Sequence, residues 1–77
     1  MKIENGVLIN INKSDIINET VVIPNGVTKI GSDAFKEWKS LREIHIPNGV
    51  TQIGKAAFEY CPNLTKINIP DSVTEIG

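Results

Sequence analysis

The stretch PNGVTKIGSDAFKEWKSLREIHI, residues 24–46, is followed at once by PNGVTQIGKAAFEYCPNLTKINI, residues 47–69. The two stretches agree at 12 of 23 positions, and the next eight residues, PDSVTEIG, agree with the start of the second stretch at 5 of 8. A short fixed period is typical of solenoids, in which each repeat forms one coil and buries its apolar side chains against the next. The sequence therefore predicts two complete coils, 24–46 and 47–69, and a partial coil, 70–77.

Apolar residues recur at fixed positions within each repeat. The pattern L-x-x-I-x-I closes a full repeat, and its I-x-I part has the two-residue period of a strand with one buried face. A proline follows, which ends the strand because it has no backbone N–H to donate. The pattern V-x-x-I-G then predicts a second short extended segment. The main positions are Leu41 and Leu64, Ile44 and Ile67, Ile46 and Ile69, Val50 and Val73, and Ile53 and Ile76.

Between the two extended segments, each full repeat carries an Ala-Phe pair. Ala34-Phe35 and Ala57-Phe58 are followed, three residues after the phenylalanine, by Trp38 or Cys61. Apolar residues at three-residue steps predict one or two helical turns, here on the side opposite the first strand.

The first twenty residues lie outside this pattern. Apolar residues flank Asn5-Gly6, and an Asn-Gly pair in that setting predicts a β-hairpin. Residues 12–19 are a polar connection whose Ile16 and Ile17 are expected to tuck under the first coil. We therefore divide the chain into an N-terminal hairpin cap and connection, 1–20, and a repeat region, 21–77, entered by a strand over 20–23.

Composition excludes several classes of function. The chain has 77 residues, 8 basic and 9 acidic side chains and a net charge of −1, with no block of like charge. A nucleic-acid binder or a polybasic membrane anchor would carry a basic patch. The start, MKIENGVLIN, has one lysine and no apolar run of signal-peptide length. We expect no nucleic-acid partner, no membrane insertion and no cofactor.

Taken together, the patterns L-x-x-I-x-I-P, V-x-x-I-G and A-F-x-x-[WC]-x-x-L resemble the BspA-type leucine-rich repeats, a family of bacterial and protist surface proteins. The resemblance covers residues 21–77 and implies an α/β repeat fold, a right-handed leucine-rich-repeat solenoid with parallel strands on its concave face. It also implies a non-enzymatic role in adhesion or protein recognition, at the cell surface or outside the cell.

Two surfaces are candidates for that role. The first is the outer face of the parallel sheet, where leucine-rich-repeat proteins commonly bind, although a plain solvated sheet face is the alternative. Its expected residues are Thr20, Val22, Glu43, His45, Lys66 and Asn68. The second is the open C-terminal end of the stack, where two copies could meet as a closed dimer or a fibre could grow. Its expected residues are Leu64, Ile67, Ile69, Val73 and Ile76.

Reactive side chains are few. His45 is the only histidine and Cys61 the only cysteine, so one chain cannot assemble an ordinary zinc site. Cys61 takes the position that Trp38 holds one repeat earlier, which favours an apolar packing role over a reactive thiol. No nucleophile or triad signature surrounds His45. Asn12, Asn18 and Asn63 begin glycosylation sequons, although simple turn chemistry is the favoured explanation of each. The sequence predicts no catalytic site.

Overall fold

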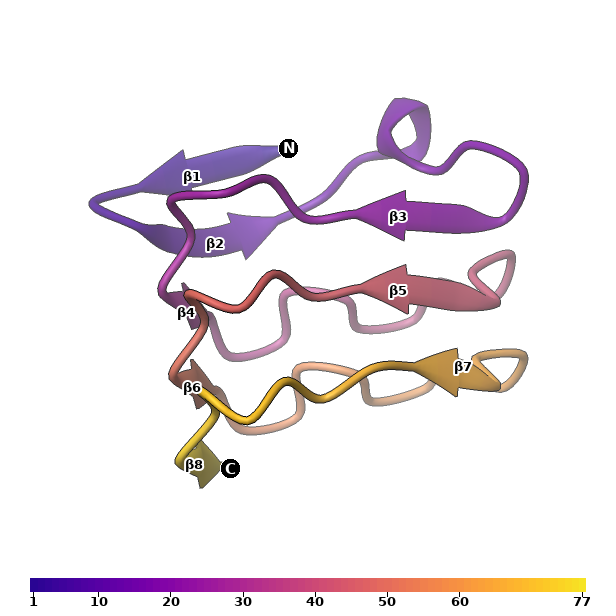
Figure 1. The fold of residues 1–77 in the computed structure, drawn as a ribbon. Helices are drawn as coiled ribbons and strands as arrows, with labels where there is room; N and C mark the ends of the chain where they lie inside the picture. Colours follow the sequence, from indigo (N-terminus) through magenta and orange to yellow (C-terminus); the bar gives the residue numbers. More distant parts are fainter.

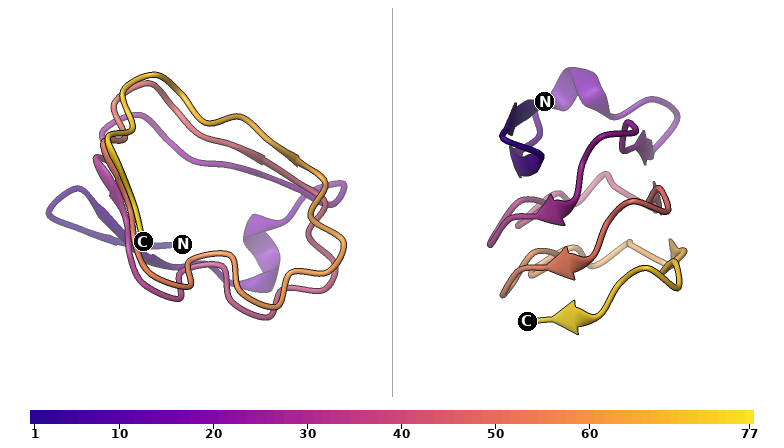
Figure 2. Two further views of the ribbon diagram at one scale, coloured as in Figure 1. Left: turned by 90° about the horizontal axis from the view of Figure 1, so that it is seen from below. Right: turned by 60° about the vertical axis from the view of Figure 1, so that its left-hand side comes forward.

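A computed structural model describes all residues, 1–77. Eight short strands form two sheets, and the chain winds between them coil by coil (Figure 1). Viewed along the stack, successive coils overlie one another as a single closed outline (Figure 2). The strands are β1 (Lys2–Glu4), β2 (Val7–Asn10), β3 (Thr20–Val22), β4 (Lys29–Ile30), β5 (Glu43–His45), β6 (Gln52–Ile53), β7 (Lys66–Ile67) and β8 (Glu75–Ile76).

The first sheet is the one expected from the I-x-I pattern. Strands β3, β5 and β7 are parallel, and Val21, Ile44 and Ile67 lie in register across them. Val21 and Ile44 are buried, and their strand neighbours face outward. The 23-residue period therefore sets the strand register, as the sequence predicts, because shifting it by one residue would expose the aliphatic side chains.

The second sheet contains the V-x-x-I-G segments. Strands β4, β6 and β8 are parallel, with Ile30, Ile53 and Ile76 in register. Strand β2 extends this row because Leu8 pairs with Ile30, and β1 pairs antiparallel with β2 on the far side. The β1–β2 turn contains Asn5 and Gly6, both at positive φ, as hairpin turns of this type require. The hairpin thus covers the outer edge of β2.

A 3₁₀ helix, η1 (Lys13–Asp15), connects the hairpin to the first coil. The Asn12 side chain caps it by accepting from the Ser14 N–H at 3.1 Å. Ile16 packs against the core, as expected, but the Ile17 side chain is 69% exposed, so the prediction that both residues are tucked in is wrong for Ile17. Ile17 forms a bridge with Thr20, and this pairing turns its side chain outward.

Asp15 anchors this connection to the start of the chain. Its carboxylate lies 2.7 Å from the Met1 amino group and accepts from the Asn12 N–H at 2.9 Å. The hydrogen bond from the amino group, and then that from Asn12, lower the pKa of Asp15 below its ordinary value of 3.8. A lowered folded-state pKa means that the carboxylate stabilises the fold above that ordinary value. This contribution is lost as the pH falls through the folded-state pKa.

We expect Asp15→Asn to lower the free energy of unfolding at neutral pH, because the amide cannot pair with the amino group as an anion does. The difference from wild type should shrink as the wild-type carboxyl protonates below pH 3.8. Urea denaturation at a series of pH values measures this. A difference that stays constant into acid would show that the ion pair does not stabilise the fold.

The outer segments between the two sheets contain no helix. Residues 32–37 and 55–60 are runs of hydrogen-bonded turns, such as Lys36 N–H to the Asp33 carbonyl, so the prediction of helical turns there is wrong. Asp33 and Ala56 have φ of 62° and 58°, which a right-handed helix does not allow. The three-residue apolar spacing is common to both structures, which is why it misleads.

The core runs the length of the stack between the two sheets. It holds 14 buried residues, all apolar, and no polar or charged residue is buried. Phe35 is the largest fully buried side chain and stacks on Phe58 of the next coil with ring centroids 5.5 Å apart. Each coil thus buries its apolar side chains against a neighbouring coil, as expected of a solenoid.

Candidate functional site

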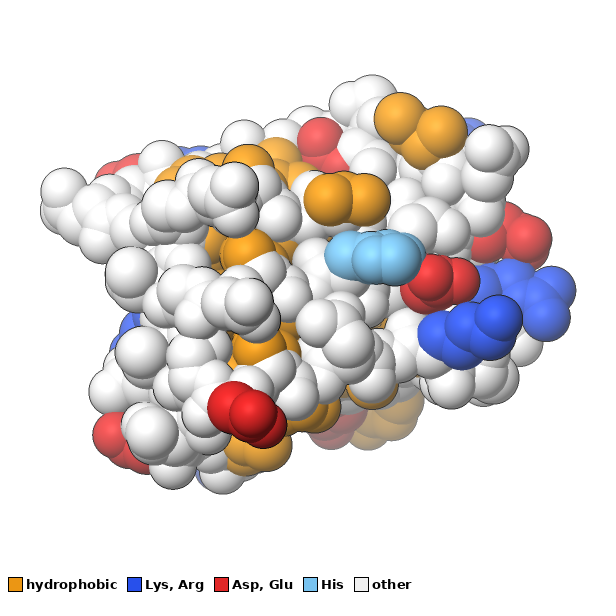
Figure 3. All heavy atoms as spheres, in the orientation of Figure 1, with side chains coloured by type: hydrophobic (Ala, Val, Ile, Leu, Met, Phe, Trp, Pro, Cys, Tyr) orange, Lys and Arg blue, Asp and Glu red, His pale blue; other side chains and the backbone are white.

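The outer face of the β3-β5-β7 sheet carries the first candidate surface. Strand alternation and register place Thr20, Glu43 and Lys66 in one row across the strands. Val22 and His45 form a second row. The structure therefore brings these five expected residues onto one face. Figure 3 shows the single histidine on this face with acidic and basic side chains close by.

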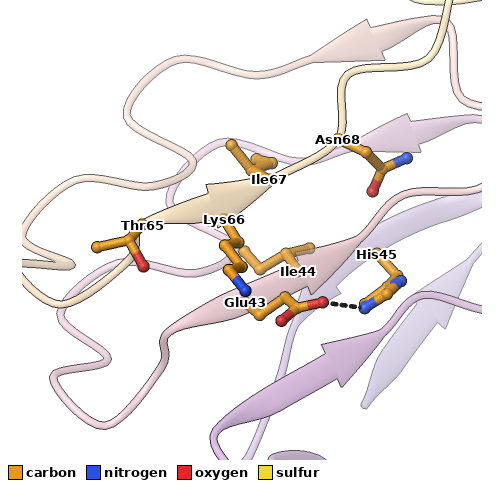
Figure 4. A pocket seen from close by; sticks show the side chains of 7 residues that line it. All are labelled: Glu43, Ile44, His45, Thr65, Lys66, Ile67 and Asn68. Carbon is orange, nitrogen blue, oxygen red and sulfur yellow. Dashed lines mark hydrogen bonds and ion pairs between the residues drawn. The ribbon is translucent and has the colours of Figure 1, made fainter.

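A shallow hollow of about 380 Å³ lies between β5 and β7 on this face (Figure 4). Four of the expected residues line it, and three neighbouring residues complete the lining. The full lining is Glu43, Ile44, His45, Thr65, Lys66, Ile67 and Asn68. Sequence reasoning did not single out Thr65, because it precedes the strand and its position at the rim depends on how the chain enters β7.

Of the charged groups in the hollow, Glu43 has a partner and Lys66 has none. The Glu43 carboxylate meets His45 Nε2 at 2.5 Å, so these two neighbours on one strand face form an internal pair. Lys66 lies across from Glu43 on β7, and its exposed ammonium forms no ion pair. The hollow therefore offers one free cation beside a carboxylate that already has a partner.

Asn68 has a different role from the one expected. Its amide forms two hydrogen bonds with the backbone of the preceding coil. It accepts from the Ile46 N–H and donates to the Ile46 carbonyl, both at 2.9 Å. An asparagine side chain supplies both a donor and an acceptor, so it can replace a missing stretch of strand pairing. The polar atoms of Asn68 are thus used within the fold, although its side chain lines the hollow.

The C-terminal end of the stack is the second candidate surface. Ile69 and Ile76 are 45% and 65% exposed, whereas Ile46 and Ile53, the same positions one coil earlier, are 4% and 3% exposed. Leu64, Ile67 and Val73 are partly buried where their earlier counterparts are fully buried. All five expected residues therefore lie at an end where no further coil covers them.

The remaining candidates form no chemical centre. No group of three or more His, Cys, Asp or Glu side chains could hold a metal ion. The Cys61 thiol is half-buried and donates to the Phe35 carbonyl, and burial raises its pKa, which makes the thiolate nucleophile less available. The Asn63 amide donates to the Lys39 carbonyl, a structural use of one sequon asparagine. None of the helices is long and apolar enough to cross a membrane.

Stacked coils with parallel strands in a 23-residue register define this chain as a leucine-rich-repeat protein. The family model described as "BspA type Leucine rich repeat region (6 copies)" matches residues 9–77, and the chain belongs to that family. Among solved structures, it is similar to a leucine-rich-repeat protein of T. pallidum, with a TM-score of 0.70 and 35% sequence identity. That match covers 74% of this chain and 29% of the other. A search of curated proteins found no match.

Membership of this family suggests a protein-interaction module. Such proteins are typically non-enzymatic recognition modules. The family is also commonly associated with cell surfaces.

Proposed function

We propose that this chain is a non-enzymatic recognition module that binds a protein partner through the outer face of the β3-β5-β7 sheet. The observation that supports this most strongly is a contrast between two sets of positions on the same strands. The inward residue is aliphatic in every coil, whereas the outward residues change in size and charge. The outward residues are Thr20, Glu43 and Lys66 in one row and Val22 and His45 in the other. Folding requires an aliphatic side chain at each inward position. The outward positions can vary without affecting the core and are therefore available for recognition.

The chemistry of this face favours a partner with a carboxylate and some apolar surface. The unpaired ammonium of Lys66 can meet the carboxylate, and Val22, whose side chain is 66% exposed, can pack against the apolar part. We further propose that the solenoid is right-handed, that this sheet is its concave face, and that the chain works in adhesion at the cell surface or outside the cell. On a concave face, side chains from successive coils converge on one partner.

A charge exchange on this face tests the proposal. The double variant Glu43→Lys with Lys66→Glu keeps the net charge and reverses the pattern of the hollow. A matched control, Lys29→Glu with Glu75→Lys, makes the same exchange in the outward row of the β4-β6-β8 sheet. Immobilised chains are incubated with surface extract of the source cells. We expect the face variant to capture at least about tenfold less of a protein that wild type and control retain.

Two outcomes would contradict this proposal. The face variant could capture the same proteins at wild-type levels, which would place recognition elsewhere. Alternatively, both variants could lose capture equally, which would mean that the exchange acts through general electrostatics and not through this face.

A second candidate function is self-association through the C-terminal end. The exposure of Ile69 and Ile76, at positions that are buried in the preceding coil, supports it, because uncovered apolar surface and strand edges tend to find partners. In this account the chain is a structural subunit that dimerises or polymerises.

If the chain self-associates there, Ile76→Lys should return it to a monomer, because a charge would have to be buried in the contact. The matched control is Ile17→Lys, an equally exposed isoleucine in the N-terminal connection. Light scattering after size exclusion, over a wide concentration range, gives the molar mass. A wild-type chain that is monomeric throughout would exclude this candidate, as would an oligomer that Ile76→Lys leaves intact.

A further inference from the structure

Ile17 adds a second exposed apolar side chain to the outer face of the β3-β5-β7 sheet. Ile17 and Thr20 form an antiparallel bridge, and each donates its N–H to the carbonyl of the other, at 2.9 Å and 3.0 Å. Directly opposed residues of an antiparallel pair project to the same side of a sheet. Because Thr20 and Val22 alternate with the buried Val21, the Ile17 side chain lies on the same face as Thr20 and Val22.

The outward direction of Ile17 is set by the turn that follows it. Asn18 and Glu19 have φ of 51° and 63°, the left-handed values that a tight two-residue hairpin turn requires. Ile17 and Val22 are diagonal neighbours across this hairpin, about 7–8 Å apart. Both point away from the core, and they are 69% and 66% exposed. These two residues, the apolar pair, therefore owe their exposure to local strand pairing and not to the absence of a neighbouring coil.

Charged groups adjoin the apolar pair on one side. Val22 lies beside His45 on β5, and Thr20 lies beside Glu43. The Lys66 ammonium comes next, on β7, because Lys66 is in register with Glu43. In Figure 3, apolar side chains lie above the histidine, and acidic and basic side chains lie below it and to its right. The face thus changes from apolar to charged along the stack.

A second, smaller hollow holds the cations of this face. It has a volume of about 230 Å³, and Arg42, Glu43 and Lys66 are among its lining residues. The Arg42 guanidinium lies 4.0 Å from the Glu19 carboxylate, and both side chains are 59% exposed. An exposed ion pair at that distance contributes little to stability, so Arg42 can turn to another carboxylate. Both carboxylates of the hollow already have a partner, whereas Lys66 has none.

We propose that the apolar pair is the anchor site of this face, for an extended protein segment with an aliphatic side chain two residues from a carboxylate. The aliphatic side chain covers Ile17 and Val22, and the carboxylate meets Lys66. Strands β3 and β7 are two strand spacings apart, about 10 Å. Side chains two residues apart in an extended segment point the same way and lie about 7 Å apart, and the long lysine side chain spans the remainder.

Other occupants match only part of this surface. A small anion would engage Lys66 and Arg42 but leave the apolar pair in water. A purely apolar segment would cover the Glu43–His45 pair without offering it a hydrogen bond, which is costly. This inference rests on the proposed function and adds the chemistry that the face recognises.

Nuclear magnetic resonance titration of the isotope-labelled chain tests the anchor site. The probe is the peptide acetyl-Gly-Ser-Leu-Ser-Glu-Ser-Gly-amide, and two matched peptides carry alanine in place of its leucine or glutamine in place of its glutamate. We expect the probe to shift the amide signals of Val22 and His45. Each matched peptide should bind at least about fivefold more weakly, because it lacks one of the two contacts.

The double variant Ile17→Thr with Val22→Thr removes the apolar pair from the chain itself. Threonine keeps the β-branched shape that strands favour, and neither residue is buried, so we expect the fold to be retained. The variant should bind the probe at least about fivefold more weakly than wild type. The matched control, Ile9→Thr, changes an exposed isoleucine of β2 in the other sheet and should bind as wild type does.

Several results would overturn the inference. A probe that shifts no signal on this face would show that the face does not take such a segment. Undiminished binding of the alanine peptide, or of the double variant, would show that the leucine does not contact the apolar pair. Equal weakening by Ile9→Thr would show that the effect is not specific to this face.

The capture experiment separates this inference from the proposed function. If the exchange of Glu43 and Lys66 abolishes capture but the Ile17→Thr, Val22→Thr variant retains it, the face binds its partner without the anchor. The proposed function then stands and the inference fails. If the charge exchange leaves capture unchanged, the proposed function itself fails.

Discussion

Gly54→Ala is expected to lower the free energy of unfolding by about 1–3 kcal/mol, or more if the coils cannot separate locally. A Cβ placed on Gly54 would lie 2.6 Å from the Ser32 backbone nitrogen and 2.8 Å from the Gly31 carbonyl carbon. These are backbone atoms of the preceding coil, so no side-chain rotation can relieve the overlap. Gly54 does not have a positive φ, and the cost is therefore one of space and not of backbone conformation.

Gly49 provides the matched control in the same coil. A Cβ there would meet only the Val27 carbonyl oxygen, at an ordinary 3.6 Å. Gly49→Ala should change stability by less than about 0.5 kcal/mol, as surface substitutions usually do. Urea denaturation followed by circular dichroism measures both variants. Equal midpoints for the two variants would mean that the coils are not held as closely in solution as the structure has them.

The period predicted more of the fold than any single residue did. Matching residues 23 apart fixed the register of both sheets, because each aliphatic position must lie over its counterpart to remain buried. The repeat also places a glycine after each second extended segment, at Gly31 and Gly54, but it does not indicate that the coils approach closely there. Only the positions of the neighbouring coil's backbone atoms show that.

The errors arose where contacts between coils decide the local structure. The apolar spacing after Phe35 fits a helical turn, yet the chain there pairs with the next coil through alternate N–H groups, which a helix would use internally. Ile17 was expected inside, but the bridge to Thr20 determines its direction. No pattern in the local sequence indicates either contact.

The candidate surfaces were partly predictable for the same reason. Alternation along a strand was enough to place Glu43, His45 and Lys66 on one face, because the period of two is a property of the strand itself. The hollow between β5 and β7 and the hydrogen bond between Asn68 and Ile46 depend on distances between coils, which alternation along one strand does not give. The alternate N–H pairing of residues 33–37 with the next coil could not be predicted, since it follows from a turn geometry that the local sequence does not specify.

Phe35→Ala should be the most damaging side-chain truncation, costing about 3–5 kcal/mol. Phe35 is completely buried and is the largest such side chain, so its removal leaves a cavity that the close coils cannot fill. A domain of this size has a total stability of only about 4–12 kcal/mol, on the usual scale of stability per residue. We therefore expect the variant to be largely unfolded well below the wild-type melting temperature, as thermal and urea denaturation will show.

Phe58→Ala is the informative comparison, because it deletes the same side chain one coil later. Phe58 is only partly buried, and it loses the stack on Phe35 but little else, so its truncation should cost clearly less. A Phe58→Ala variant as unstable as Phe35→Ala would mean that the last coil is covered in solution, and concentration dependence of that instability would identify the cover as another copy.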